Sequence, residues 1–320
     1  MATDQTAAPR TAAGTATSSP SGETFRITVP DEATFSMDKV TPIRHNFDRH
    51  PLMQLDALEA LANRLMPTQQ CRFIKPGATF AAGFDHDGKP TDGRDLRDVF
   101  ARIHEPKSWI ALYNVETDPL YAGLLGEAVG SVRHLVDRQQ PGTFLMTGFI
   151  FISAPPSVTP FHIDRENNFW LQIRGKKTMN VWNREDRVMV EQKHVEQFIT
   201  YRSLENVKLH DEKLTSRSLE MDCGPGDGVY FPSTSPHATR SEPSWTKPDD
   251  GVAISIGINF YTSVTRKHAH LHALNSLLRK VGLNPGYPGE NGAMDSLKLP
   301  LADAYVAVQK KRGFEAPPGF

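Results

Sequence analysis

Two side chains that bind metals stand two positions apart in the segment TPFHID, residues 159–164. The segment reads as extended chain, and in a strand the side chains of residues i and i+2 lie on one face. His162 and Asp164 are therefore expected to point the same way. A neutral imidazole and a carboxylate are suitable ligands for iron(II), and a second histidine would complete a facial triad that leaves coordination positions open for oxygen chemistry.

His237 is the candidate for that second histidine. It follows GDGVYFP, residues 226–232, where a turn and a short apolar strand would deliver a side chain at a strand end. Taken alone, an HxD pair is weak evidence, because the chain has 12 histidines and such a pair is more often structural or solvated. The metal-site hypothesis therefore depends on the sequence around the three residues.

The elements that must position these residues are short β-rich runs. From Thr143 to Thr262 the chain alternates such runs with Pro and Gly, in the spacing that is typical of a β-barrel or a jelly roll. The sequence therefore predicts that residues 143–262 form a β core. The runs are TFLMTGFIFIS, FWLQI, KTMNVW, GVYF and VAISIGINFYT.

Helical patterns flank this core on both sides. Residues 24–142 are predicted to be a mixed α/β part, and residues 263–320 are predicted to be helical, with a leucine stripe after residue 270. Residues 1–23 are rich in Ala, Thr, Ser, Gly and Pro, which predicts a disordered leader. The helical parts are too fragmented to form hydrophobic cores of their own. We therefore expect residues 24–320 to form a single body. The expected elements are strands at 25–29 and 109–113 and helices at 51–66, 95–103, 119–136 and 301–310.

Composition excludes several classes of protein. Lys plus Arg number 36 against 37 Asp plus Glu, so there is no general attraction to nucleic acid or to an anionic membrane. The two cysteines, Cys71 and Cys223, form no CxxC pair, which argues against a disulfide framework and a cysteine zinc site. No apolar run approaches the roughly 18 residues that a membrane helix needs. We therefore expect a cytoplasmic protein that binds neither nucleic acid nor membrane.

A longer pattern surrounds the three candidate ligands. HIDRENNFWLQIRGKK, residues 162–177, followed by GPGDGVYFPSTSPH, residues 224–237, resembles the JmjC-type hydroxylases, and among them the asparaginyl hydroxylases. The resemblance runs from about residue 143 to residue 262. It implies a mainly β fold with flanking α-helices, a double-stranded β-helix (a cupin-like jelly roll) with a metal at its open end. It also implies Fe(II), 2-oxoglutarate as cosubstrate and O2.

The resemblance assigns roles by position. His162, Asp164 and His237 match the iron ligands, and Lys177 matches the cation that receives the distal carboxylate of 2-oxoglutarate. Thr159 and Asn168 match residues that hydrogen-bond the cosubstrate, and Asn259 matches one near its metal-binding end. The alternatives are that Lys177 is a solvated lysine after the Gly175 turn, that Thr159 is a turn residue, and that each asparagine satisfies backbone groups.

The function that the resemblance implies is hydroxylation of an amino-acid side chain in a peptide, a protein or an amino-acid-like metabolite. Two alternatives remain: another metal-dependent cupin enzyme that does not use 2-oxoglutarate, and an inert JmjC-like regulatory binding protein. Tyr113 and Arg165 are candidates for the substrate side, and the C-terminal helices are candidates for a homodimer contact. His268, His270 and His272 form a second histidine cluster, but no third ligand beside the pair His268 and His272 is evident, so a solvated or interface helix is favoured there.

Overall fold

The structure is a computed structural model, and it describes residues 23–74, 79–82, 86–90, 93–105, 109–242, 244 and 251–320. The predicted leader, residues 1–23, lies outside the described residues apart from Glu23. Among the helices in the described ranges, none is both long enough and apolar enough to cross a membrane.

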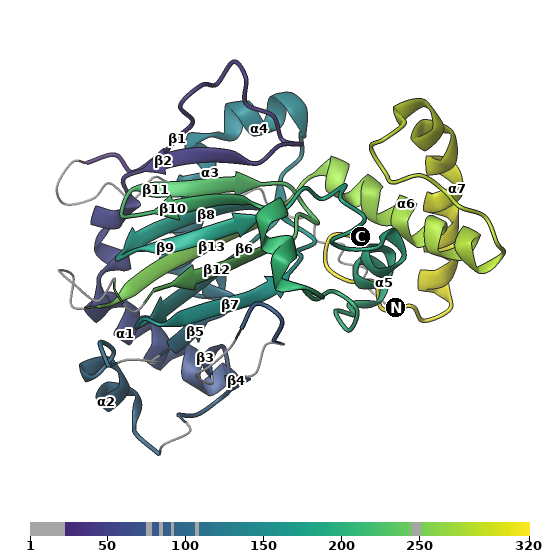
Figure 1. Cartoon of the computed structure of the whole chain (residues 1–320). Coiled ribbons are helices and arrows are strands. Elements are labelled where there is room, and N and C mark those ends of the chain that lie inside the picture. The colour runs from purple at the N-terminus through teal and green to yellow at the C-terminus, as the bar shows by residue number, and fades with distance from the viewer. Residues whose placement is uncertain are drawn as a thin grey trace, which may run out of the picture.

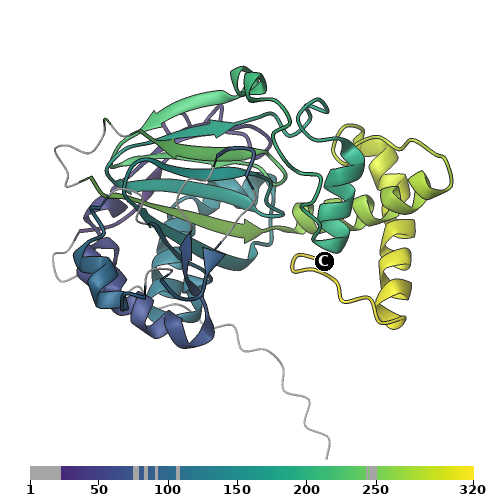
Figure 2. The same cartoon turned by 60° about the horizontal axis from the view of Figure 1, so that its bottom comes forward.

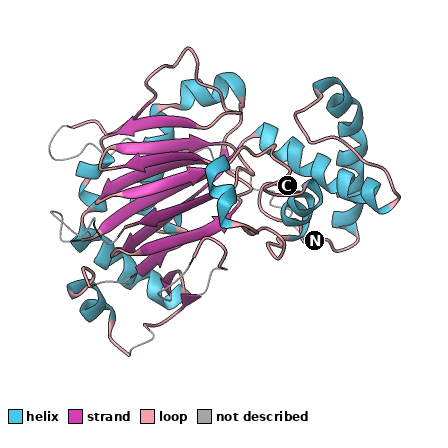
Figure 3. Ribbon diagram, in the orientation of Figure 1, coloured by secondary structure: helices cyan, strands magenta, loops and turns pink. Residues whose placement is uncertain are grey.

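Two antiparallel sheets stacked on each other form the centre of the molecule (Figures 1 and 3). The smaller sheet has the strand order β10-β9-β12-β7, and the larger sheet has the order β11-β8-β13-β6 at its centre. The chain passes back and forth between the two sheets, which is the winding of a double-stranded β-helix. The predicted jelly-roll core is therefore confirmed. Its strands are β6 (Phe144–Ser153), β7 (Ser157–His162), β8 (Asn167–Arg174), β9 (Lys177–Val181), β10 (Leu219–Cys223), β11 (Asp227–Phe231), β12 (His237–Ser241) and β13 (Ala253–Tyr261).

The larger sheet continues beyond the core at both edges, where strands of the N-terminal part widen it. Added beyond β11 are β2 (Thr41–His45) and β1 (Ile27–Thr28), and added beyond β6 are β5 (Trp109–Leu112), β3 (Cys71–Ile74) and β4 (His86–Asp87). The α-helices are α1 (Leu55–Leu65), α2 (Leu96–Ala101), α3 (Pro119–Ser131), α4 (Arg133–Gln139), α5 (Gln192–Tyr201), α6 (Ser263–Lys280) and α7 (Gly292–Lys311).

The N-terminal helices pack on the outer face of the larger sheet (Figure 2). Leu58 and Leu61 of α1 and Leu125 of α3 belong to one cluster of buried apolar side chains that also holds Ile150 of β6 and Ile256 of β13. Burying one such side chain contributes about 1.5–3 kcal/mol, so packing on the sheet stabilises helices that would be marginal alone. The division of residues 24–320 into three parts of a single body stays a prediction.

The C-terminal helices lie beyond one end of the sandwich, where α6 contacts both α5 and α7 (Figure 1). α6 starts directly after β13, and the side chains and backbone N–H groups of Thr262 and Thr265 hydrogen-bond each other in a capping box. This cap fixes the start of the helix beside the strand end. A second apolar cluster joins α5 and α6 to Phe161 and Ile163, the two neighbours of His162. The C-terminal helices therefore support the loop that carries the candidate ligands.

Several elements differ from the expectation. The predicted helix 119–136 is divided at Val132, whose ψ of 10° breaks the helical geometry between α3 and α4. The last helix starts at Gly292, capped by Asn291, and runs through Pro300 instead of starting after it. Strands β10 and β12 and helix α5 were not predicted, because β10 and β12 are short and partly polar and α5 has only three periodic apolar residues.

Two glycines set tight turns in the β core, one after β8 and one before β11. Gly175, between β8 and β9, has φ +64°, and a Cβ there would lie 2.5 Å from the backbone oxygen of Val252. Gly226, before β11, has φ +86°. Only glycine adopts such angles without steric cost, so both turns require it. The first turn places Lys177 at the start of β9.

Candidate active site

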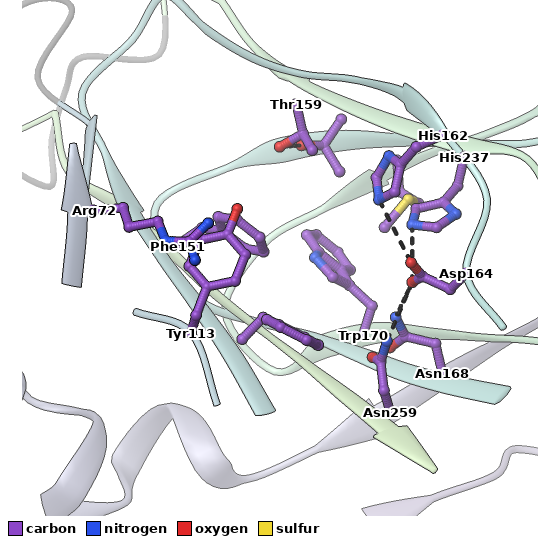
Figure 4. Close-up of a pocket in the computed structure, with 14 residues that line it drawn as sticks. Arg72, Tyr113, Phe151, Thr159, His162, Asp164, Asn168, Trp170, His237 and Asn259 are labelled. Atoms are coloured by element: carbon purple, nitrogen blue, oxygen red, sulfur yellow. Dashed lines mark hydrogen bonds and ion pairs between the residues drawn. The ribbon is translucent and has the colours of Figure 1, made fainter. Parts of the chain in front are cut away.

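The three predicted ligands come together at one end of the sandwich (Figure 4). His162 ends β7 and pairs in register with His237, which begins β12, and Asp164 follows in the loop after β7. Nε2 of His162 lies 4.0 Å from Oδ1 of Asp164, and Nε2 of His237 lies 3.6 Å from Oδ2. One ligand atom of each residue lies within 4.8 Å of the others, which is close enough for a shared metal ion.

Backbone carbonyl groups orient both imidazole rings. Nδ1 of His162 lies 2.8 Å from the oxygen of Pro160, and Nδ1 of His237 lies 3.0 Å from the oxygen of Ser235. A carbonyl oxygen accepts, so Nδ1 carries the proton and Nε2 keeps its lone pair for the centre of the cluster. Burial, followed by the neighbouring His162, lowers the pKa of His237 to about 4, which keeps this ring neutral.

Two amides hold the carboxylate. Asn259 and Asn168 are register partners on β13 and β8, and their Nδ2 atoms donate to Oδ2 of Asp164 at 3.2 and 3.4 Å. Burial alone would raise the pKa of Asp164, but His237, His162 and the two amides together lower it. The sequence had related both asparagines to the cosubstrate. The structure shows them as hydrogen-bond partners of Asp164, a candidate metal ligand.

A pocket of about 280 Å³ extends from the ligand cluster between the sheets. Arg72, Tyr113 and Phe151 lie at the end opposite the cluster, and Trp170 lies between the two ends (Figure 4). Thr159 lines this pocket, and its hydroxyl accepts a hydrogen bond from Thr239 at 2.9 Å. The lining residues are Arg72, Tyr113, Phe149, Phe151, Thr159, His162, Asp164, Asn168, Trp170, Met179, His237, Thr239, Gly257 and Asn259.

Lys177 is buried, with 2% of its surface exposed, so it is not a solvated lysine. Its Nζ donates to the hydroxyl of Ser255 at 3.2 Å and lies 5.9 Å from the ring centroid of Phe151. Burial lowers the pKa of Lys177 to about 7, and within the described part of the chain no carboxylate pairs with it. Lys177 is not itself among the lining residues of the pocket. Its link to the pocket is the ring of Phe151, which is a lining residue and lies near Nζ.

Arg72 is the charged lining residue that the sequence did not indicate. Its register partner on β5 is Ala111, whose own partner on β6 is Phe151. The small side chain of Ala111 leaves room for the guanidinium, which lies 4.5 Å from the ring centroid of Tyr113. Only the alternation in CRFI, residues 71–74, hinted at a residue that faces the pocket, and strand pairing across three elements was needed to place it.

The two candidates for the substrate side lie apart from each other. Tyr113 lines the pocket, but Arg165 lines a second cavity near α6 and lies 5.3 Å from the ring centroid of Phe198. His268 and His272 line that second cavity too, and His270 pairs with Asp303 at 2.7 Å. Among the described residues, only His162, Asp164 and His237 form a group of three side chains suited to a metal.

The fold and the ligand cluster define a cupin-type double-stranded β-helix with a candidate metal site at one end. A family model for the JmjC domain matches residues 141–265 of the chain. No curated protein matches the chain. The closer resemblance to asparaginyl hydroxylases stays a prediction.

Solved structures of the ribosomal oxygenase YcfD from Escherichia coli resemble this chain. One covers 88% of this chain and 68% of its own, with 14% identity and a TM-score of 0.46. A second covers 89% and 69%, with 14% identity and a TM-score of 0.49. A third, in complex with cobalt and 2-oxoglutarate, covers 88% and 68%, with 14% identity and a TM-score of 0.46.

Proposed function

We propose that this protein is an iron(II)- and 2-oxoglutarate-dependent oxygenase that hydroxylates an amino-acid side chain. The observation that carries the proposal is the convergence of His162, Asp164 and His237, all within the residues that match the JmjC domain model, beside a pocket. Two imidazole nitrogens and one carboxylate oxygen are the donor set that suits iron(II) with open coordination positions. When bound there, iron would supply the chemistry that couples O2 and oxidative decarboxylation of 2-oxoglutarate to C–H oxidation.

The protein's own residues would bind and orient the cosubstrate. Lys177 would receive the distal carboxylate, since a buried ammonium needs an anion as partner. Arg72 adds positive charge at the end of the pocket that holds Phe151, whose ring lies 5.9 Å from Nζ of Lys177, and Thr159 also lines the pocket. The amides of Asn168 and Asn259 would keep the Asp164 carboxylate in place while the pocket fills.

The aromatic walls of the pocket would exclude water and hold the substrate carbon beside the metal. Tyr113, Phe149 and Trp170 form this wall, and the ring of Tyr113 lies edge-on to that of Phe149 with centroids 5.4 Å apart. Holding the reacting atoms in place is the main contribution that a protein makes when a cofactor performs the difficult step. The substrate class proposed is a side chain of a peptide, of a protein or of an amino-acid-like metabolite.

Formation of succinate and consumption of O2 test the proposal directly. The native protein with iron(II) and 2-oxoglutarate is expected to show both, and His162→Ala is expected to show neither. His270→Ala is the matched control, because His270 lies on α6 and pairs with Asp303 away from the ligand cluster. Equal turnover by the native protein and His162→Ala would exclude the assignment.

Anaerobic binding of 2-oxoglutarate separates this proposal from its alternatives. A cupin enzyme that does not use 2-oxoglutarate would bind metal but not the cosubstrate. An inert regulatory protein would bind its partner but form no succinate. Binding that is lost in Lys177→Met, together with succinate formation by the native protein, is the result that the proposed function requires.

A further inference from the structure

A second cavity lies between the loop that carries Asp164 and the C-terminal helices. Its volume is about 20 Å³, which is enough for one small occupant such as a water molecule or a halide ion. We propose that this cavity binds a single small monovalent anion of halide size, which braces the loop against α6. The proposal does not depend on the proposed oxygenase activity.

Hydrogen-bond donors without partners are concentrated on the residues that line the cavity. Nε and Nη1 of Arg165 and Nε of Arg184 are buried donors that have no partner among the described residues. Nδ1 of His272 is also buried without a partner there, and the tautomer of the ring decides whether it donates or accepts. A guanidinium has only donors, and it stays protonated at any physiological pH. A water molecule brings two donors of its own, whereas an anion only accepts. The excess of donors therefore favours an anion over water as the occupant.

The charges around the cavity also favour an anion as the occupant. No Asp or Glu is among its described lining residues. Nη2 of Arg184 donates to Asp38 at 3.0 Å, but Asp38 is 62% exposed and Arg184 is 9% exposed, so this acid meets the guanidinium from the solvent side. On the other side, the buried carboxyl of Glu166 accepts from the hydroxyl of the lining residue Tyr261 at 2.5 Å. Burial raises the pKa of Glu166 and Arg165 lowers it, so Glu166 is an acid close to the Arg165 side of the cavity.

The neighbours of the cavity histidines are mainly cationic. Burial lowers the pKa of His272 well below its usual value, and the nearby His268, Arg187, Arg184 and Lys298 lower it further. Burial also lowers the pKa of His268 to about 4, and Arg184 acts in the same direction while Asp295 opposes it. Both rings are thus neutral, and the fixed positive charge at the cavity comes from the two arginines that line it.

The lining residues connect the cavity to the candidate active site. The backbone N–H of Thr234 donates to the backbone oxygen of Asp164 at 2.8 Å, and the hydroxyl of Ser233 donates to the backbone oxygen of Arg165 at 2.8 Å. Thr234 also shares a hydrogen bond with the hydroxyl of Tyr287, which lies between α6 and α7. An anion held here would therefore oppose separation of the C-terminal helices from the loop.

The test compares chloride with gluconate, which is too large for the cavity, at equal ionic strength on the full chain. The midpoint of thermal unfolding is expected to be roughly 2–4 °C higher in chloride. Crystals grown in bromide are expected to show one anomalous peak in the cavity. Arg184→Gln is expected to remove both effects. Asp38→Asn is the matched control, because it breaks the same ion pair but keeps the guanidinium, and it should keep both effects.

Three results would overturn the proposal. The first is equal midpoints in the two salts without a bromide peak, and the second is a chloride effect of the same size in Arg184→Gln, which would show general screening. The third is loss of both effects in Asp38→Asn. If Arg184→Gln does not fold, the native protein and Asp38→Asn still decide the question through the bromide peak and the midpoints.

Discussion

Asp164 receives more support from its neighbours than either histidine, because two amides donate to the same carboxylate oxygen. We expect Asn259→Ala to reduce the affinity for a divalent metal by about 10–100-fold, since outer partners fix the ligand orientation. Titration with cobalt(II), followed by its absorbance, measures this. Asn63→Ala, an exposed asparagine on α1, is the control. An unchanged affinity in Asn259→Ala would show that the amide plays no part in metal binding.

Lys177 predicts a pH dependence of cosubstrate binding. Burial lowers its pKa to about 7, so above pH 7 the cosubstrate-free protein holds the amine mostly neutral. A carboxylate prefers the ammonium form, so binding above pH 7 takes up a proton, and affinity falls as pH rises, by up to about tenfold per unit. Below pH 7 the amine is already charged, and the uptake disappears.

Calorimetry with 2-oxoglutarate at pH 6 and pH 8.5, each in two buffers of different ionisation enthalpy, measures this uptake. Lys177→Arg is the control, because a guanidinium stays protonated and its binding should involve no proton at this position. Equal proton uptake by the native protein at both pH values would contradict the prediction.

At the scale of residues, the sequence predicted the three candidate ligands but not the groups that orient them. His162, Asp164 and His237 were found because ligand types at fixed spacings are visible in one dimension, and they now lie together. The partners that orient the rings are the backbone oxygens of Pro160 and Ser235, which carry no sequence signal. Arg72 was missed for a different reason: its place depends on the pairing of three strands that are distant in the chain.

At the scale of elements, the turn between β8 and β9 controls where Lys177 lies. We expect Gly175→Ala to destabilise the fold by about 2–3 kcal/mol, because the Cβ would clash with the Val252 backbone in addition to the strain of a positive φ. Gly282→Ala is matched, since its φ is +84° and no atom lies within 4 Å of its Cβ. Urea unfolding should show the larger loss for Gly175→Ala; equal losses would mean that backbone strain alone matters.

The elements that the sequence predicted well are those with a strong period or composition. β8 and β13 are rich in apolar residues because both of their faces are covered, and β6 is rich in them too although its first residues are only partly buried. β12 reads HATRS, a mixture without period, and it is a strand because β7 and β9 pair with it on both sides. Its first residue is a candidate ligand, so the sequence identified the side chain but not the element that holds it.

At the scale of the whole molecule, the C-terminal helices offer a surface for a second copy of the chain. Met294, Leu297 and Leu301 lie on one stripe of α7 and are 51%, 77% and 60% exposed. An exposed apolar patch on a soluble protein commonly marks an interface. We expect a homodimer in light scattering and a monomer after Leu297→Glu with Leu301→Glu. Ala307→Glu, on another face of α7, should stay dimeric, and a monomeric native protein would contradict the prediction.

The candidate ligands also connect an edge strand, β7, to an inner strand, β12. β7 is the edge strand of the smaller sheet, and among the described strands of that sheet it pairs with β12 alone. His162 and His237 are register partners at the end of this pair, so a metal held by both would fasten the edge strand to its neighbour. We therefore expect metal removal to speed amide hydrogen exchange in β7 while β8, in the centre of the larger sheet, stays protected. Mass spectrometry with and without a chelator measures this, and uniform change in both strands would count against it. Loss of metal would then loosen the strand that carries His162, so that catalysis and local rigidity would fail together.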